Sequence, residues 1–193
     1  MDPSKTPESI GTANRRFLLD LARTSVLCRL EGRPVPHSPP SSEVLLEPRG
    51  AFVTLKIDRM LRGCIGHVIG VSPLWKSVSD NAAAAAFEDP RFPPLTVEEF
   101  AKVVFEISAL TALTTVSSED VVVGRDGILI ERGGARGLLL PQVAVEHGWD
   151  RKAFLDHTCR KAGIEIGGWR HPDTVISTFS AEVFSEDGFS ITS

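Results

Sequence analysis

The residues best suited to chemistry lie in the hexapeptide L-R-G-C-I-G, residues 61–66. An ionised thiol is a strong nucleophile, and a neighbouring guanidinium favours the ionised form. Alternation along a strand would place Arg62, Cys64 and Gly66 on one face and His67 on the other. This pattern favours a reactive Cys64 with Arg62 as its electrostatic activator. The competing interpretation is a free cysteine packed as a small buried hydrophobe.

A metal site built on Cys64 and His67 is disfavoured by geometry and by ligand number. In a regular strand the two side chains point to opposite faces, and they meet only where glycines bend the backbone. A structural zinc takes four ligands, and the sequence has no second C-x-x-C or H-x-x-x-H pair. Cys159 and His157 are two residues apart in a predicted helix and face different sides. The sequence therefore identifies no metal and no other cofactor.

Two further charged residues are candidates for the same site. In the β-rich run 102–111, Glu106 stands on the strand face opposite Phe105 and Ile107. We expect Glu106 to be either a general acid or base, or a structural partner of an arginine such as Arg62 or Arg91. Arg91, in the segment D-P-R-F-P-P, is a candidate clamp for an anionic ligand, although a turn that ends a helix would also explain this segment.

Two other patterns carry no chemistry of their own. Gly133, Gly134 and Gly137 lack a Walker lysine and a strand-to-helix context, so they predict a hairpin turn rather than a phosphate-binding loop. There is no G-x-S-x-G elbow, so a serine hydrolase is unsupported.

A series of helices and strands must position these residues. Asn14 is predicted to cap the first helix, Asp58-Arg59 to turn the first hairpin, and Thr96 with Glu99 to cap a short helix. The predicted helices span residues 14–30, 72–87, 141–147 and 151–162. The predicted strands span residues 51–57, 60–71, 102–111, 121–123, 128–131, 138–140 and 174–184. This order predicts an α+β fold in which a mixed or antiparallel sheet packs with helices.

Composition places the chain among ordinary soluble globular proteins. Its 193 residues are 42% hydrophobic and 24% charged, and no apolar run approaches the length of a membrane span. Three widely spaced cysteines argue against a disulfide framework and for a reducing compartment, so we expect a cytoplasmic protein. A net charge of −4 argues against nucleic-acid binding, since phosphate binding needs concentrated basic surface.

Several segments together resemble one known family, the AMMECR family, whose prokaryotic members are called AmmeMemoRadiSam system protein A. The segments that carry the resemblance are L-R-G-C-I-G at 61–66, D-P-R-F-P-P at 89–94, F-E-I-S at 105–108, L-L-P-Q-V-A at 139–144, G-W-D at 148–150 and C-R-K-A-G at 159–163. They occur in family order over residues 14–184, so we expect that range to form the domain, with tails at 1–13 and 185–193.

The resemblance implies a two-lobed structure. A larger lobe of sheet and helices and a smaller α+β lobe would flank a cleft, with the hexapeptide near it. The resemblance also implies genetic association with a Memo-like protein and a radical S-adenosylmethionine protein, which would act in a shared pathway. The predicted catalytic residues are Cys64, Glu106 and Arg62, and the predicted ligand-binding residues are Gly63, Gly66, His67 and Arg91.

Two functional hypotheses from different classes remain open, with a weaker third. The first is a thiol-dependent enzyme, with Cys64 as the nucleophile or covalent carrier of a small molecule. The second is a non-catalytic adaptor that binds a peptide or protein, in which Cys64 merely packs and Cys64→Ser leaves function intact. The third is nucleic-acid association, which the acidic net charge disfavours.

Overall fold

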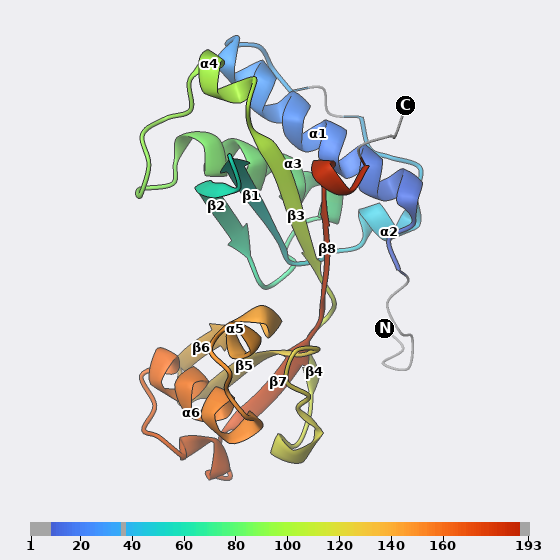
Figure 1. Cartoon of the computed structure of the whole chain (residues 1–193). Coiled ribbons are helices and arrows are strands. Elements are labelled where there is room, and N and C mark those ends of the chain that lie inside the picture. Colours follow the sequence, from blue (N-terminus) through green and yellow to red (C-terminus); the bar gives the residue numbers. More distant parts are fainter. Residues whose placement is uncertain (1–8, 36–37, 190–193) are drawn as a thin grey trace. The chain divides into compact units, whose positions relative to one another are not determined.

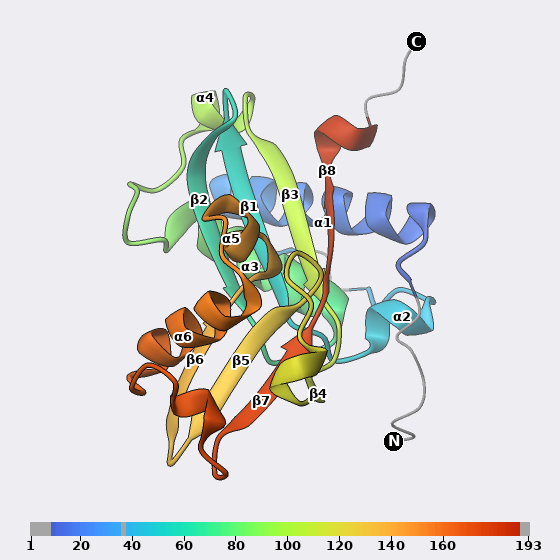
Figure 2. The same cartoon turned by 60° about the horizontal axis from the view of Figure 1, so that its bottom comes forward.

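The computed structural model of the protein describes residues 9–35 and 38–189. The chain divides into two compact units, one formed by Met1–Leu110 together with Glu182–Ser193 and the other by Thr111–Ala181. Each unit contains one four-stranded sheet with helices packed against it (Figures 1 and 2). The predicted α+β fold class is confirmed. The predicted cleft between two lobes stays a prediction.

The first sheet has the strand order β2-β1-β3-β8. Its strands are β1 (Ala51–Ile57), β2 (Met60–His67), β3 (Val104–Leu110) and β8 (Ala181–Ser185). Asp58 and Arg59 have positive φ angles of 50° and 64°, which is the backbone of a tight hairpin turn between β1 and β2. The predicted turn is therefore confirmed. β2 stops at His67, short of the predicted end at residue 71.

Helices cover one face of this sheet. They are α1 (Thr12–Leu30), α2 (Glu43–Leu46), α3 (Leu74–Phe87) and α4 (Val97–Phe100). The side chains of Val53, Leu55, Phe105 and Ile107 alternate along β1 and β3 and enter one core with α1 and α3. The buried alanines of α3 let its backbone lie close to the sheet. The opposite face of the sheet has no helix of its own unit among the described residues.

The first helix begins earlier than predicted. Its N-cap is Gly11, and Asn14 lies inside the helix, where its amide nitrogen donates to the hydroxyl of Ser42 at 2.9 Å. The prediction that Asn14 caps the helix is therefore wrong, because the side chain bonds to a distant residue instead. The capping box of Thr96 and Glu99 is confirmed, with both reciprocal hydrogen bonds present.

The second unit holds a sheet of order β4-β7-β5-β6. Its strands are β4 (Thr114–Thr115), β5 (Gly127–Arg132), β6 (Ala135–Leu139) and β7 (Val175–Phe179), and its helices are α5 (Pro141–Glu146) and α6 (Arg151–Ala162). Gly133 and Gly134 turn the β5–β6 hairpin with positive φ angles, which confirms the predicted turn. Asp150 and Gly163 bound α6 as predicted.

The last predicted strand, 174–184, is two strands in two different sheets. β7 ends at Phe179 and β8 begins at Ala181, and the chain passes from one unit to the other after Ala181. Ser180 and Thr111 pair there, with the Thr111 N–H donating to the Ser180 carbonyl at 2.9 Å. The sequence has no glycine or proline between residues 174 and 184, and it therefore gives no sign of the change of sheet.

The predicted tails overlap ordered elements. Thr12 and Ala13 belong to α1, and Ser185 to β8, which is followed by a 3₁₀ turn at Glu186–Phe189. Residues 9–11 of the predicted N-terminal tail are described as well, and Ile10 is buried in the core of the first unit. Residues 1–8 and 190–193 lie outside the described residues. Among the described helices, none combines the length and the apolar character that crossing a bilayer requires.

Candidate functional site

Cys64 lies on the face of the first sheet that its own unit leaves without a helix. The strand register sets Cys64 opposite Thr54 and Thr54 opposite Glu106. Residues directly opposite each other in neighbouring strands project from the same face. The neighbours Val53 and Leu55 enter the helix-covered core, so this row of three residues lies on the other side. The sheet thus presents a thiol, a hydroxyl and a carboxylate in line across three strands.

The thiol of Cys64 is half-buried and has a polar partner. The hydroxyl of Thr54 donates to the Cys64 Sγ at 3.3 Å. The other cysteines, Cys28 and Cys159, are buried in the cores. Burial also raises the pKa of the Cys159 thiol, which disfavours its reactive form. Cys64 is therefore the cysteine that reagents in solution can reach.

The side chains of Asp89 and Arg91 form hydrogen bonds with the backbone of Cys64 at the edge of the sheet. β2 is an edge strand, and the Cys64 N–H donates to Asp89 Oδ2 at 2.9 Å. Arg91 Nη2 donates to the Cys64 carbonyl at 3.3 Å. Arg91 is itself held by Asp89, through Nε to Oδ1 at 3.0 Å and Nη2 to Oδ2 at 2.7 Å. We call Asp89 and Arg91 the edge clasp, because they occupy the place of a neighbouring strand.

The two members of the edge clasp differ in their exposure. The Asp89 side chain is 2% exposed, whereas that of Arg91 is 54% exposed. Hydrogen bonds from Arg91 hold the pKa of Asp89 well below its usual range, although burial acts in the opposite direction. Asp89 is therefore a fixed anion, and Arg91 is the half-exposed cation that it anchors.

Arg62 does not share the face of Cys64. Gly63 pairs with Leu55 and Leu61 with Lys56, so Arg62 is the extra residue of a β-bulge. Alternation with period two does not hold across a bulge, which is the physical reason that the predicted face was wrong. The Arg62 side chain is 10% exposed and binds Glu99.

The contacts of Arg62 tie the edge strand to α4. Its Nε and Nη2 each lie 2.8 Å from a carboxylate oxygen of Glu99, and Nη2 also donates to the Pro93 carbonyl at 2.9 Å. These bonds lower the pKa of Glu99. Arg62 is therefore engaged in the structure of its unit, and the contacts do not support its predicted role as activator of Cys64.

Glu106 pairs with Lys56, and not with either arginine predicted for it. Lys56 Nζ lies 2.8 Å from Glu106 Oε2. Both side chains stand on the same face of the sheet as Thr54, Lys56 two residues along β1 and Glu106 on the neighbouring strand β3. Since neighbouring strands are about 4.8 Å apart, the Cα atoms of Cys64 and Glu106 are on the order of 10 Å apart. Glu106 thus does not touch the thiol, but both residues are within reach of one small molecule.

Close packing leaves no room for a side chain at either glycine of the hexapeptide. A Cβ on Gly63 would lie 2.2 Å from the carbonyl oxygen of Ala85, so only glycine lets α3 approach β2. A Cβ on Gly66 would lie 2.4 Å from the ring of Phe52. His67 is exposed at the end of β2. Ligand binding by these three residues stays a prediction.

Three residues of this region, Thr54, Lys56 and Asp89, were not predicted from the sequence. Thr54 and Lys56 alternate with Val53 and Leu55 along β1, and this signal was present in the sequence. Asp89 gave no such signal, because an aspartate before a proline at the end of a helix is common in turns. Only the fold brings its carboxylate to the β2 edge.

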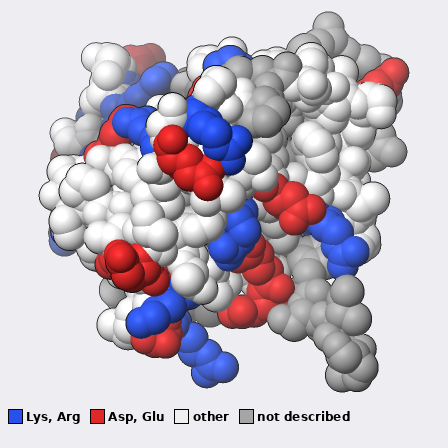
Figure 3. All heavy atoms as spheres, turned by 90° about the horizontal axis from the view of Figure 1, so that it is seen from above, with Lys and Arg blue, Asp and Glu red and all other residues white. Residues whose placement is uncertain are grey.

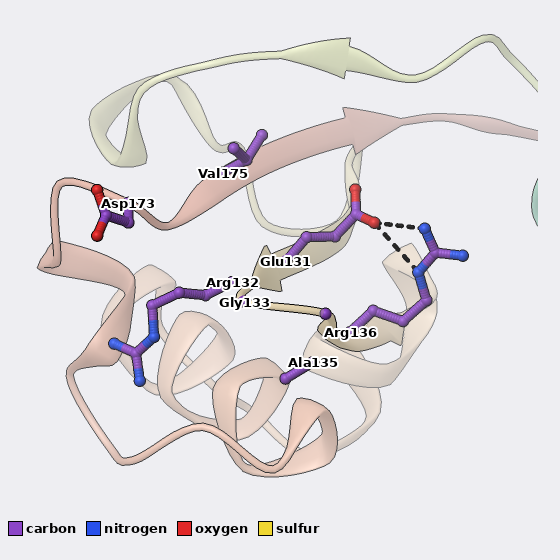
Figure 4. Close-up of a pocket in the computed structure, with 8 residues that line it drawn as sticks. Glu131, Arg132, Gly133, Ala135, Arg136, Asp173 and Val175 are labelled. Atoms are coloured by element: carbon purple, nitrogen blue, oxygen red, sulfur yellow. Dashed lines mark hydrogen bonds and ion pairs between the residues drawn. The ribbon is translucent and has the colours of Figure 1, made fainter.

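A shallow hollow of about 350 Å³ lies elsewhere, at the β5–β6 hairpin of the second unit (Figure 4). It is lined by Glu131, Arg132, Gly133, Gly134, Ala135, Arg136, Asp173 and Val175. Its two arginines are both bound to carboxylates, Arg136 to Glu131 and Arg132 to Glu165. In Figure 4 the Arg132 side chain extends away from the Glu131–Arg136 pair. The hollow therefore contains none of the predicted site residues and no cation that is free to bind a ligand.

The charged side chains do not gather by sign on the face shown in Figure 3. Basic and acidic groups are interspersed there. A nucleic-acid-binding surface would concentrate lysine and arginine instead.

Comparison with known proteins finds a family model, relatives of similar length and a solved structure. The AMMECR1 family model matches residues 19–184. Protein NEQ441 of Nanoarchaeum equitans is 42% identical over 178 residues, covering 88% of this chain and 99% of that protein. A protein of Aquifex aeolicus is 40% identical, covering 89% of this chain and 92% of its own length. The crystal structure of the uncharacterized protein PH0010 from Pyrococcus horikoshii has a TM-score of 0.75 and 39% identity, covering 88% of this chain and 89% of that one.

Proposed function

The chain belongs to the AMMECR1 family, and on that premise we propose that it is a thiol-dependent protein whose reactive group is Cys64. The observation that carries the proposal is the hydrogen bond from the Thr54 hydroxyl to the Cys64 Sγ at 3.3 Å, on the face of the sheet that carries no helix of its own unit among the described residues. A donor aimed at sulfur stabilises the thiolate more than the thiol. A buried structural cysteine would need no such donor.

The Lys56–Glu106 pair supplies the acid and base in this proposal. It stands on the same face as Cys64, and Thr54 lies between them. The pair acts on a substrate that spans the three strands, and not on the sulfur itself. A lysine and a glutamate in contact can pass a proton to or from such a substrate.

The experiment that tests the proposal measures the alkylation rate of Cys64 by iodoacetamide at pH 7. The rate in the folded chain is compared with the rate in the same chain unfolded in urea, and with folded Thr54→Val. We expect the folded chain to react faster than the unfolded chain. We also expect Thr54→Val, which removes the donor and keeps the side-chain shape, to lower the rate several-fold. If Cys64 is alkylated no faster in the folded chain than in the unfolded chain, the proposal of a reactive thiol is wrong.

A second candidate function is a non-catalytic adaptor. Exposed apolar side chains at the tip of the β1–β2 hairpin favour it, since Met60 is 72% exposed and Leu61 follows it. In this case Cys64→Ser would leave partner binding intact, whereas Met60→Ser with Leu61→Ser would weaken it. The partners to test are the Memo-like protein and the radical S-adenosylmethionine protein that the family resemblance implies, each by co-purification with the full chain. A cytoplasmic location is part of both proposals.

A further inference from the structure

Arg91 is the cation that the fold holds against the backbone of Cys64. Its Nη2 donates to the Cys64 carbonyl at 3.3 Å, and the carbonyl oxygen and Sγ of one cysteine are roughly 3–5 Å apart. Hydrogen bonds to Asp89 raise the pKa of Arg91, so its guanidinium is a permanent cation. Its Nη2 therefore lies within about 8 Å of the sulfur, where the sequence had suggested Arg62.

One nitrogen of Arg91 is left for a ligand. The Asp89 carboxylate accepts hydrogen bonds from Nε and Nη2 of Arg91, and the Cys64 carbonyl accepts a second hydrogen bond from Nη2. Nη1 has no hydrogen-bond partner among the described residues, and the side chain is 54% exposed. Because Asp89 is 2% exposed and binds the guanidinium through both carboxylate oxygens, it fixes the direction in which Nη1 points.

We propose that Arg91 makes Cys64 selective for electrophiles that carry a negative charge beside the reacting atom, and that Asp89 is the positioning residue for Arg91. This inference rests on the proposed reactivity of Cys64. A carboxylate or phosphate of the substrate accepts hydrogen bonds from Nη1, and the neighbouring carbon then faces the sulfur. Neutral electrophiles of the same size gain nothing from the guanidinium. The substrate class is therefore small anionic electrophiles.

Two alkylating agents of similar size test this selectivity. Iodoacetate carries a carboxylate beside its reacting carbon, and iodoacetamide carries a neutral amide. With either reagent an S–C bond forms, iodide leaves with the electron pair of the C–I bond, and the thiol proton passes to water. The measured quantity is the ratio of the iodoacetate rate to the iodoacetamide rate at Cys64, at pH 7 and low salt. Mass spectrometry of the Cys64 peptide separates it from buried Cys28 and Cys159.

We expect the ratio in the folded chain to exceed that of the urea-unfolded chain by about 1.5- to 5-fold, the range for a partly exposed charge pair. Arg91→Gln should bring the ratio down to the unfolded value, and Arg91→Lys should keep part of the gain. Asp89→Asn should lower the ratio as well, because the guanidinium loses its anchor. Sodium chloride at 1 M should lower the wild-type ratio through screening, and this measurement needs no variant.

The chain offers a matched control in its second unit. Arg125 is 63% exposed and binds Asp126, which is 7% exposed and accepts a backbone N–H from Val122. Arg125→Gln removes the same kind of pair far along the chain and should leave the ratio unchanged. A wild-type ratio equal to the unfolded ratio, with no effect of Arg91→Gln or salt, overturns the selectivity, while fast reaction with iodoacetamide would still support a reactive thiol. Slow reaction with both reagents overturns the reactive thiol and the selectivity together.

Discussion

The carboxylate of Asp89 accepts the backbone N–H of Cys64 at 2.9 Å, although 25 residues separate them in the chain. This bond occupies an outward-facing donor of an edge strand, which would otherwise be open to water or to another strand. The same carboxylate holds Arg91 against the Cys64 carbonyl. The segment D-P-R-F therefore protects the β2 edge and fixes the residue that the hexapeptide presents.

Asp89→Asn should destabilise the first unit by about 1–3 kcal/mol, because a buried acceptor of several hydrogen bonds becomes neutral and turns one oxygen into a donor. Urea unfolding followed by circular dichroism measures the change. The control is Asp80→Asn, which removes an exposed pair with Lys76 and should cost less than about 0.5 kcal/mol. Equal losses in the two variants would contradict a special role for Asp89.

The stability of the fold should fall in acid, in part because of Asp89. The pKa of Asp89 is lower in the folded chain than its ordinary value of 3.8, because of Arg91. The unfolded state therefore binds more protons below that pH, and the stability that the carboxylate provides is lost as pH falls from about 4 towards the folded pKa. Unfolding in urea at several pH values between 2.5 and 6 should show this decline. The decline should be shallower in Asp89→Asn, and an identical slope would rule out the assignment.

Much of the fold could be predicted from local signals. The hairpin at Asp58-Arg59, the Thr96–Glu99 capping box and the Gly133-Gly134 turn each depend on residues a few positions apart, and the structure contains all three. The division of residues 174–184 between two sheets could not be predicted, because no glycine or proline interrupts this run and the separation depends on which distant strands pair.

The candidate site was predictable in its position and not in its contacts. The hexapeptide identified Cys64, and alternation along β1 contained the signal for Thr54. The bulge at Arg62 could not be read from the sequence, because it depends on a register shift between Leu55 and Lys56 of the partner strand. Once that shift is present, Arg62 binds Glu99, and Arg91 takes the position near Cys64.

Gly63→Ala should destabilise the chain by about 1–3 kcal/mol or more, because the added Cβ would lie 2.2 Å from the Ala85 carbonyl and α3 would have to move. The matched control is Gly188→Ala, where nothing lies within 4 Å of the new Cβ. That variant should change stability by less than about 0.5 kcal/mol. Thermal and urea unfolding of both proteins would test the comparison. A neutral Gly63→Ala would mean that the glycine is not required by packing.

Arg62→Gln distinguishes the role of Arg62 from that of Arg91. The variant breaks a bidentate pair at a side chain that is 10% exposed, so it should lower stability by about 1–3 kcal/mol. The ratio of iodoacetate to iodoacetamide rates at Cys64 should stay at the wild-type value, because the Arg62 guanidinium binds Glu99 and lies on the other side of the bulge. Arg91→Gln should lower the ratio, and it should also cost stability, because it leaves the buried Asp89 carboxylate without its cation, so the ratio is the measurement that distinguishes the two arginines. If Arg62→Gln lowers the ratio while the chain remains folded, Arg62 acts on the thiol after all, and the assignment of that role to Arg91 is wrong.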